Sequence, residues 1–188
     1  MPLPPPAPRE PIHTRQVICN GFRRDDGLWE IEGHLTDTKT YDFDTQYRGL
    51  VHAGEPVHGM WIRLTLDDEL VIRDVTAVMD HNPFPTCPAI TPNFARIKGL
   101  SIKPGFHAKL RELLGGVEGC THLVEMMGPV ATTAFQTIYP YRERLRRQAG
   151  EKSARAPGAR PPLLDTCHSF SSRGAIVKEI WPEFYKGD

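Results

Sequence analysis

The amino-acid sequence predicts an α+β fold, in which a small twisted antiparallel sheet from the N-terminal half packs against helices from the C-terminal half. Residues 13–80 contain two pairs of segments that alternate apolar and polar side chains with a period of two, which is typical of half-buried strands. Residues 91–181 repeat their apolar side chains at helical spacing instead. We expect these helices to cover one face of the sheet.

The length of 188 residues is typical of one domain. Residues 1–12 are rich in proline and have no periodic pattern, which predicts a flexible arm. The α+β domain is then expected to span residues 13–188. Within it, residues 149–162 are rich in Ala, Arg, Gly and Pro, which indicates a mobile surface loop.

The first predicted hairpin joins residues 13–22 to residues 28–35. The intervening Asp25-Asp26-Gly27 has the composition of a hairpin turn. Alternation along the second strand places apolar side chains on one face and polar ones on the other, with Trp29, Ile31 and Leu35 opposite Glu30, Glu32 and His34.

The second predicted hairpin joins residues 57–66 to residues 69–79 through Asp67-Asp68, and both segments are rich in β-branched side chains. His58 shares the apolar face of the first of these strands, whereas Arg63 lies on the other face. Two interpretations of His58 stay open: a structural histidine at the rim of the core, and a catalytic histidine.

Helical segments follow a proline-rich loop at residues 82–88. A short helix is predicted at residues 91–97, and a second at residues 106–114, which Gly115-Gly116 ends.

A long helical segment is predicted at residues 121–148. Gly128-Pro129 and Tyr139-Pro140 are expected to kink or break it. Its basic end, residues 141–147, is interpreted as a solvated helix terminus rather than a nucleic-acid patch. A last helical pattern includes Ile176 and Trp181.

Composition excludes several classes of partner and location. The 23 basic and 23 acidic residues balance, so no nucleic-acid partner is indicated. No apolar run approaches the ~18–20 residues that cross a bilayer, and no export signal is visible. The four cysteines lie far apart, which favours free thiols or ligands over disulfides. We therefore expect a cytoplasmic protein without a membrane partner.

Three cysteines lie in distinctive local settings that suit a metal site. Cys87 lies in the proline-rich loop, Cys120 follows glycines at a helix start, and Cys167 precedes His168. Thiolate and imidazole donors suit tetrahedral zinc or an iron–sulfur species. The spacing is not that of a zinc finger, and three unconnected buried cysteines are the alternative. A zinc or iron cofactor and no cofactor are thus both open expectations.

A polar group of residues predicts acid–base chemistry. His58 or His122 would take the proton and Asp37 would orient it, because histidine titrates near neutral pH. Lys39 or Arg63 would stabilise developing negative charge. Aromatic side chains are expected to line an apolar substrate pocket, namely Trp29, Tyr41, Trp61 and Tyr139.

Several stretches resemble a bacterial domain-of-unknown-function family, number two-eight-eight-nine. They are Phe22–Gly33, Leu35–Lys39, Gly54–Met60 and Gly119–Leu123. The resemblance covers about residues 13–181. It implies a companion of aromatic and acyl-group catabolism, and so a small-molecule enzyme.

A looser resemblance is to the SufE/NifU-like iron–sulfur scaffold fold. Those proteins have a small antiparallel sheet followed by helices, and Cys87, Gly119-Cys120 and Cys167-His168 occur here in the same order. The last pair is reversed, and no Asp lies beside the first cysteine. This resemblance bears on the fold more than on the function.

The favoured function is a lyase that uses acid–base chemistry on an aromatic or apolar catabolite. Carbon–carbon cleavage or elimination beside a hydroxyl, with release of a small aldehyde, is the expected reaction. A metal held by Cys120, His122 and Cys167 would assist as a Lewis acid. The alternative is a non-catalytic metal or iron–sulfur carrier that uses Cys87, Cys120, Cys167 and His168. A third is an assembly partner without chemistry; a homo-oligomer is also an expectation.

Overall fold

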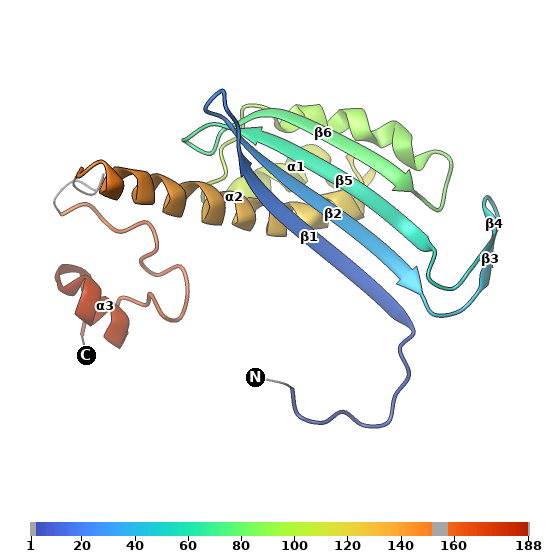
Figure 1. Cartoon of the computed structure of the whole chain (residues 1–188), viewed down its shortest axis with the longest axis horizontal. Helices are drawn as coiled ribbons and strands as arrows, with labels where there is room; N and C mark the ends of the chain where they lie inside the picture. The colour runs from blue at the N-terminus through green and yellow to red at the C-terminus, as the bar shows by residue number, and fades with distance from the viewer. Residues whose placement is uncertain (1–2, 152–157, 188) are drawn as a thin grey trace. The chain divides into compact units, whose positions relative to one another are not determined.

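The computed structural model describes residues 3–151 and 158–187. The chain divides into two compact units, Met1–Pro140 and Tyr141–Asp188. The first unit contains the sheet and the helices next to it in sequence, and the second contains short helical segments (Figure 1). These elements place the N-terminal half in strands and the C-terminal half in helices, which confirms the α+β prediction.

Four long strands form one antiparallel sheet in the order β1-β2-β5-β6 (Figure 1). They are β1 (His13–Arg23), β2 (Trp29–Lys39), β5 (Pro56–Leu66) and β6 (Ile72–His81). Both predicted hairpins are therefore present, and Gly27 adopts the positive φ of 86° that the first turn requires. Strand β2 continues to Lys39, beyond the predicted end at residue 35, and so brings Asp37 into the sheet.

A small hairpin between β2 and β5 was not predicted. Its strands are β3 (Phe43–Thr45) and β4 (Gly49–Val51). Strands of three residues are too short to display a period of two, so hydrophobic alternation gives no signal for them.

Helical segments follow the sheet. They are η1 (Cys87–Ile97), α1 (Phe106–Leu114), η2 (Gly116–Glu118) and α2 (Thr121–Gln148). The predicted helix at residues 106–114 is confirmed. The helix predicted at residues 91–97 is a 3₁₀ helix that begins earlier, at Cys87, so the expected loop is shorter.

Of the two outcomes expected at the prolines of α2, a kink or a break, the break is wrong. The helix runs from Thr121 to Gln148 with Pro129 and Pro140 inside it. Each proline lacks an N–H and so leaves one carbonyl without its intrahelical partner. Burial of one face compensates for these losses, through Leu123, Met126, Met127, Val130, Ala131, Ala134 and Ile138.

Helix α2 packs directly on one face of the sheet, which we call the inner face. At Gly33 of β2, an added Cβ would lie 2.6 Å from Val130 Cγ2 and 3.2 Å from Met126 Sδ. At Gly21 of β1, an added Cβ would overlap Thr137. The glycines therefore allow the helix to cross β2 and β1 in close contact.

Strand alternation fills the core between the sheet and the helices. From Trp29 to Asp37 on β2 the odd-numbered residues are buried and the even-numbered ones are partly exposed, which agrees with the predicted alternation. The inner-face core of the sheet includes Trp29, Ile31, Leu35, Met60, Ile62, Leu64 and Leu66.

The second unit contains α3 (Ala175–Ile180) and η3 (Pro182–Phe184). Phe170 stacks on Trp181 with 5.3 Å between ring centroids. Residues 152–157 of the predicted mobile loop lie outside the described residues. Residues 3–12 of the predicted arm form no helix or strand, and their side chains are exposed.

A search of the described residues for a membrane span found no helix with the required length and apolar character.

Candidate active site

Three neighbouring strands place Asp37 opposite Arg15 and His58 on the inner face. Asp37 pairs with Arg15 of β1 and with His58 of β5 in the register of the sheet. Because directly opposed residues point to the same face, the three side chains meet. The Asp37 side chain is only 2% exposed, and that of His58 is 16% exposed.

The Asp37 carboxylate accepts four hydrogen bonds. Arg15 donates from Nε to Oδ1 at 2.8 Å and from Nη2 to Oδ2 at 2.7 Å. His13 Nε2 lies 3.0 Å from Oδ1, and His58 Nδ1 lies 2.9 Å from Oδ2. The carboxylate is thereby fully hydrogen-bonded, which a buried charge requires.

The first turns of α2 complete the site. Arg15 Nη2 lies 2.9 Å from His122 Nδ1, and Arg15 Nη1 donates to Glu125 Oε2 at 3.2 Å. The rings of His58 and His122 lie 4.1 Å apart between centroids, at an interplanar angle of 52°. We call the six residues of this site the Asp37 cluster: His13, Arg15, Asp37, His58, His122 and Glu125.

Hydrogen-bond chemistry assigns a different tautomer to each of the two central histidines. An ionised carboxylate only accepts, so His58 donates from Nδ1 to Asp37 and its Nε2 carries a lone pair. A guanidinium only donates, so His122 accepts from Arg15 at Nδ1 and its neutral ring carries the proton on Nε2. One ring therefore offers a base and its neighbour an acid.

Both histidines remain neutral further into the acid range than a free histidine. Burial lowers the pKa of His58, and the nearby charge of a protonated His122 lowers it further, against the opposing effect of Asp37. Burial and the charge of Arg15 lower the pKa of His122. The tautomers assigned above exist only in neutral imidazole rings, so the lowered pKa values favour them.

Asp37 keeps its charge in spite of burial. Burial alone would raise the pKa of Asp37, but hydrogen bonds from Arg15 and His13 and the charge of Arg15 lower it to about 2. The hydrogen bond to Asp37 in turn raises the pKa of Arg15. The pair is therefore ionised throughout the neutral range.

A metal ion is a further chemical possibility at the same place. One ligand atom each from Asp37, His58 and His122 lies within 4.8 Å of the others. Among the described residues this is the one group of three or more metal-ligating side chains at such spacing. A cation there would compete with the guanidinium of Arg15, which already occupies both Asp37 oxygens and His122 Nδ1.

The structure brings Asp37, His58 and His122 together, three of the five predicted catalytic residues. Lys39 follows Asp37 on β2 and donates from Nζ to the hydroxyl of Tyr41 at 3.1 Å. Arg63 lies on the opposite, outer face of the sheet, where it donates from Nε to Glu32 at 2.8 Å.

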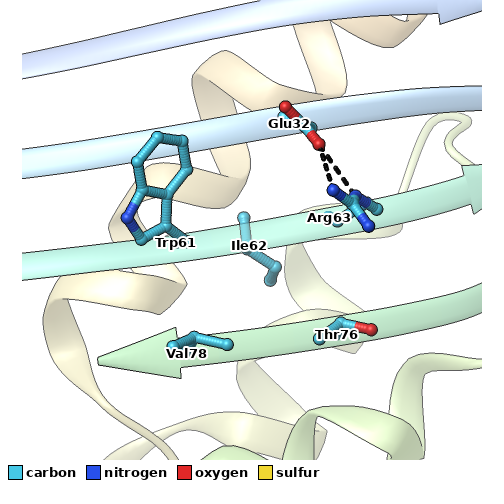
Figure 2. A pocket seen from close by; sticks show the side chains of 6 residues that line it. All are labelled: Glu32, Trp61, Ile62, Arg63, Thr76 and Val78. Atoms are coloured by element: carbon cyan, nitrogen blue, oxygen red, sulfur yellow. Dashed lines mark hydrogen bonds and ion pairs between the residues drawn. The ribbon is translucent and has the colours of Figure 1, made fainter. Parts of the chain in front are cut away.

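The outer face carries its own shallow hollow of about 310 Å³. Figure 2 shows Arg63 and Trp61 in it, with Arg63 directed at Glu32. Trp61 stacks on His34 at 3.7 Å between centroids and donates from Nε1 to Asp80 at 2.9 Å. This hollow and the Asp37 cluster lie on opposite faces of the same sheet.

The predicted aromatic substrate set is not gathered around the cluster. Trp29 lies eight residues before Asp37 on β2, about 27 Å along the strand, and donates to Asp68 at 3.0 Å. Tyr139 follows His122 on α2 by about 26 Å and stacks on Phe135 at 5.4 Å. Of this set, Tyr41 lies closest in sequence to Asp37, on the segment that leaves β2.

The four cysteines are free thiols. Cys87 is the first residue of η1, and Cys120 directly precedes α2, with its Sγ 4.0 Å from Met60 Sδ. Cys167 and His168 belong to the second unit. The carrier that these residues would form stays a prediction.

Sequence reasoning missed His13, Arg15 and Glu125. The hairpin turn offers a signal for the first two, because counting outward from Asp26 pairs Arg15 with Asp37 and His13 with Lys39. An arginine directly opposite a carboxylate on an apolar face is then visible. Glu125 depends on how α2 docks, which no local pattern specifies.

Comparisons with known proteins give one match. A family model described as "Protein of unknown function (DUF2889)" matches residues 13–136. The match begins at the first residue of β1 and ends within α2, so it includes the whole Asp37 cluster, but it is shorter than the predicted range of 13–181. Searches of curated proteins and of solved structures found no match.

Proposed function

The chain belongs to the DUF2889 family of proteins of unknown function, and from the Asp37 cluster we propose that it is a lyase that uses acid–base chemistry. Its substrate is a small aromatic or otherwise apolar compound. The reaction is carbon–carbon cleavage, or elimination, beside a hydroxyl, and cleavage releases a small aldehyde.

One observation carries the proposal. The rings of His58 and His122 lie 4.1 Å apart between centroids, and the hydrogen bonds of their Nδ1 atoms to Asp37 and Arg15 leave His58 with an unprotonated Nε2 and His122 with an Nε2–H. A base and an acid on neighbouring rings suit a reaction that removes one proton from the substrate and delivers another to it.

In this proposal His58 Nε2 takes the proton of the substrate hydroxyl. Asp37 stabilises the imidazolium that forms. The oxygen then becomes an aldehyde carbonyl as the neighbouring carbon–carbon bond breaks, and its electron pair remains on the other fragment. His122 Nε2 donates a proton to that fragment, and Arg15 supplies the positive charge that was expected of Lys39 or Arg63.

The test is aldehyde release from a panel of aryl-substituted 1,3-diols, followed by trapping of the aldehyde as a hydrazone. His58→Gln is expected to lower the rate by roughly 10²–10⁴-fold, because it removes the general base. His52→Gln is the matched control, since His52 also pairs with an aspartate, Asp42, at 3.1 Å but is exposed. Full activity in His58→Gln, or a panel without aldehyde release, would contradict the proposal.

A divalent metal at Asp37, His58 and His122 is a second candidate, supported by the spacing of their ligand atoms. Metal analysis of protein purified without oxygen or affinity-tag metal distinguishes the possibilities. About one equivalent lost in His122→Asn would place metal chemistry in the cluster, and one lost in Cys120→Ser would favour the carrier. We place the reaction in the cytoplasm, where free thiols such as these four persist.

A further inference from the structure

A groove between α1 and α2 adjoins the Asp37 cluster and has no role in the chemistry above. Its volume is about 370 Å³, within the range of small-molecule sites. It is lined by His107, Leu110, Arg111, Val124, Glu125 and Gly128.

Glu125 joins the groove to the cluster. Its side chain lines the groove, and its carboxylate accepts a hydrogen bond from Arg15, the residue that also holds Asp37. A ligand in the groove therefore lies beside the site at which a proton would be transferred.

Gly128 keeps the groove open. Glycine inside a helix costs about 1 kcal/mol relative to alanine, yet Gly128 lies in the interior of α2. A Cβ at this position would lie 3.9 Å from His107 Cε1, so an alanine fits without a clash. A longer side chain would extend from α2 towards α1 and occupy the space between them.

Arg111 is a free cation in the groove. It is exposed, and its guanidinium has no hydrogen-bond or ion-pair partner among residues 3–151 and 158–187. By contrast, Lys109 on the same helix pairs with Glu112 at 2.7 Å. An unpaired arginine beside apolar Leu110 and Val124 suits a ligand that combines an apolar body with a carboxylate.

We propose that this groove binds the substrate of the lyase and that the substrate is an aromatic carboxylate. Its ring lies against Val124 and the open surface of Gly128, above the buried Leu110, and its carboxylate pairs with Arg111. The identification of this ligand as a substrate rests on the proposed function. The binding itself can be measured without turnover.

The test compares biphenyl-4-carboxylate with its neutral isostere biphenyl-4-carboxamide, by ligand-observed NMR titration at pH 7.5. The wild-type protein should bind the carboxylate about tenfold more tightly than the amide, because one charge-assisted contact distinguishes them. Arg111→Gln should abolish this preference without changing the affinity for the amide. Lys109→Gln on the same helix should keep it.

Gly128→Leu should weaken both probes at least about tenfold, because its side chain fills the groove, whereas Gly128→Ala should keep most of the binding. Circular dichroism of both variants checks that α2 is intact. Equal affinity for the two probes in the wild-type protein, or a preference that survives Arg111→Gln, would overturn the proposal.

His58→Gln separates this proposal from the proposed function. It should abolish turnover and leave probe binding unchanged, since His58 does not line the groove. Turnover that survives His58→Gln would refute the lyase mechanism while the groove stands. If neither Arg111→Gln nor Gly128→Leu changes the affinity for the probes, the groove is not the binding site, while the mechanism stands.

Discussion

Asp37 combines burial with a full negative charge, and its neighbours make this combination stable. Four hydrogen-bond donors surround the carboxylate, and one of the donor groups is a guanidinium. A neutral side chain of the same shape cannot accept all four hydrogen bonds, and it leaves Arg15 with only the exposed Glu125 as a counter-ion.

Asp37→Asn is therefore expected to lower the free energy of unfolding by about 2 kcal/mol, the cost of unmatched polar groups in a mostly buried site. Urea denaturation measures the change. Asp42→Asn is the control, because Asp42 also binds a histidine but is 52% exposed, and it should change stability by less than about 0.5 kcal/mol. Equal effects of the two substitutions would contradict the prediction.

The proposed lyase activity should decline on the acid side only below the ordinary pKa of histidine. The proposed mechanism needs His58 unprotonated at Nε2 and His122 unprotonated at Nδ1, and burial lowers the pKa of both. Protonation of either ring removes an active form, so kcat/KM should fall as pH drops through these lowered values. An acid limb centred above pH ~6.5 would show that neither histidine controls the rate.

Residue types alone predicted only part of this site. Asp37, His58 and His122 were predicted because each is a titratable residue at the end of an element. Arg15 and His13 escaped notice because they matter only through the register of β1 against β2. Arg63 was assigned to the site from its type, although strand alternation places it on the outer face.

At the scale of elements, the sequence predicted what is periodic. The long hairpins and α1 carry enough residues for their periods to be counted. The β3–β4 hairpin is too short for this, and α2 continues through its prolines because tertiary packing outweighs local propensity.

The close crossing of α2 over β2 makes Gly33 a sensitive position. Gly33→Ala is expected to destabilise the protein by about 1–3 kcal/mol, because the new Cβ would lie 2.6 Å from Val130 Cγ2. The added substitution Val130→Ala should recover part of the loss by removing that methyl group. Thermal unfolding of both variants tests this. A double variant whose loss of stability equals or exceeds the sum of the two single losses would argue against a direct contact.

At the scale of the whole molecule, the cluster makes the folded protein less stable in acid. Three of its groups have a lowered pKa: Asp37, His58 and His122. The pKa of Asp37 falls from 3.8 to about 2, so only the unfolded chain takes up a proton as pH drops below about 4. His58 and His122 likewise resist protonation that the unfolded chain accepts below about 6.5. Each contribution is present at neutral pH and is lost on acidification.

The melting temperature should consequently fall from pH 7 to pH 3.5, and less steeply in His58→Gln, which lacks the contribution of the His58 imidazole below about pH 6.5. Differential scanning calorimetry at several pH values measures both slopes. Identical slopes for the two proteins would mean that other titratable groups account for the acid sensitivity.

Arg15 ties together parts of the chain that are remote in sequence. Its partners Asp37, His122 and Glu125 are 22, 107 and 110 residues away. The contact with Asp37 lies within one hairpin, whereas the two contacts with α2 require a long stretch of intervening chain to close. A chain with its sheet paired and α2 still undocked would hold Asp37 and His58 without His122, so the pair of histidines that the proposed reaction needs depends on the docking of α2.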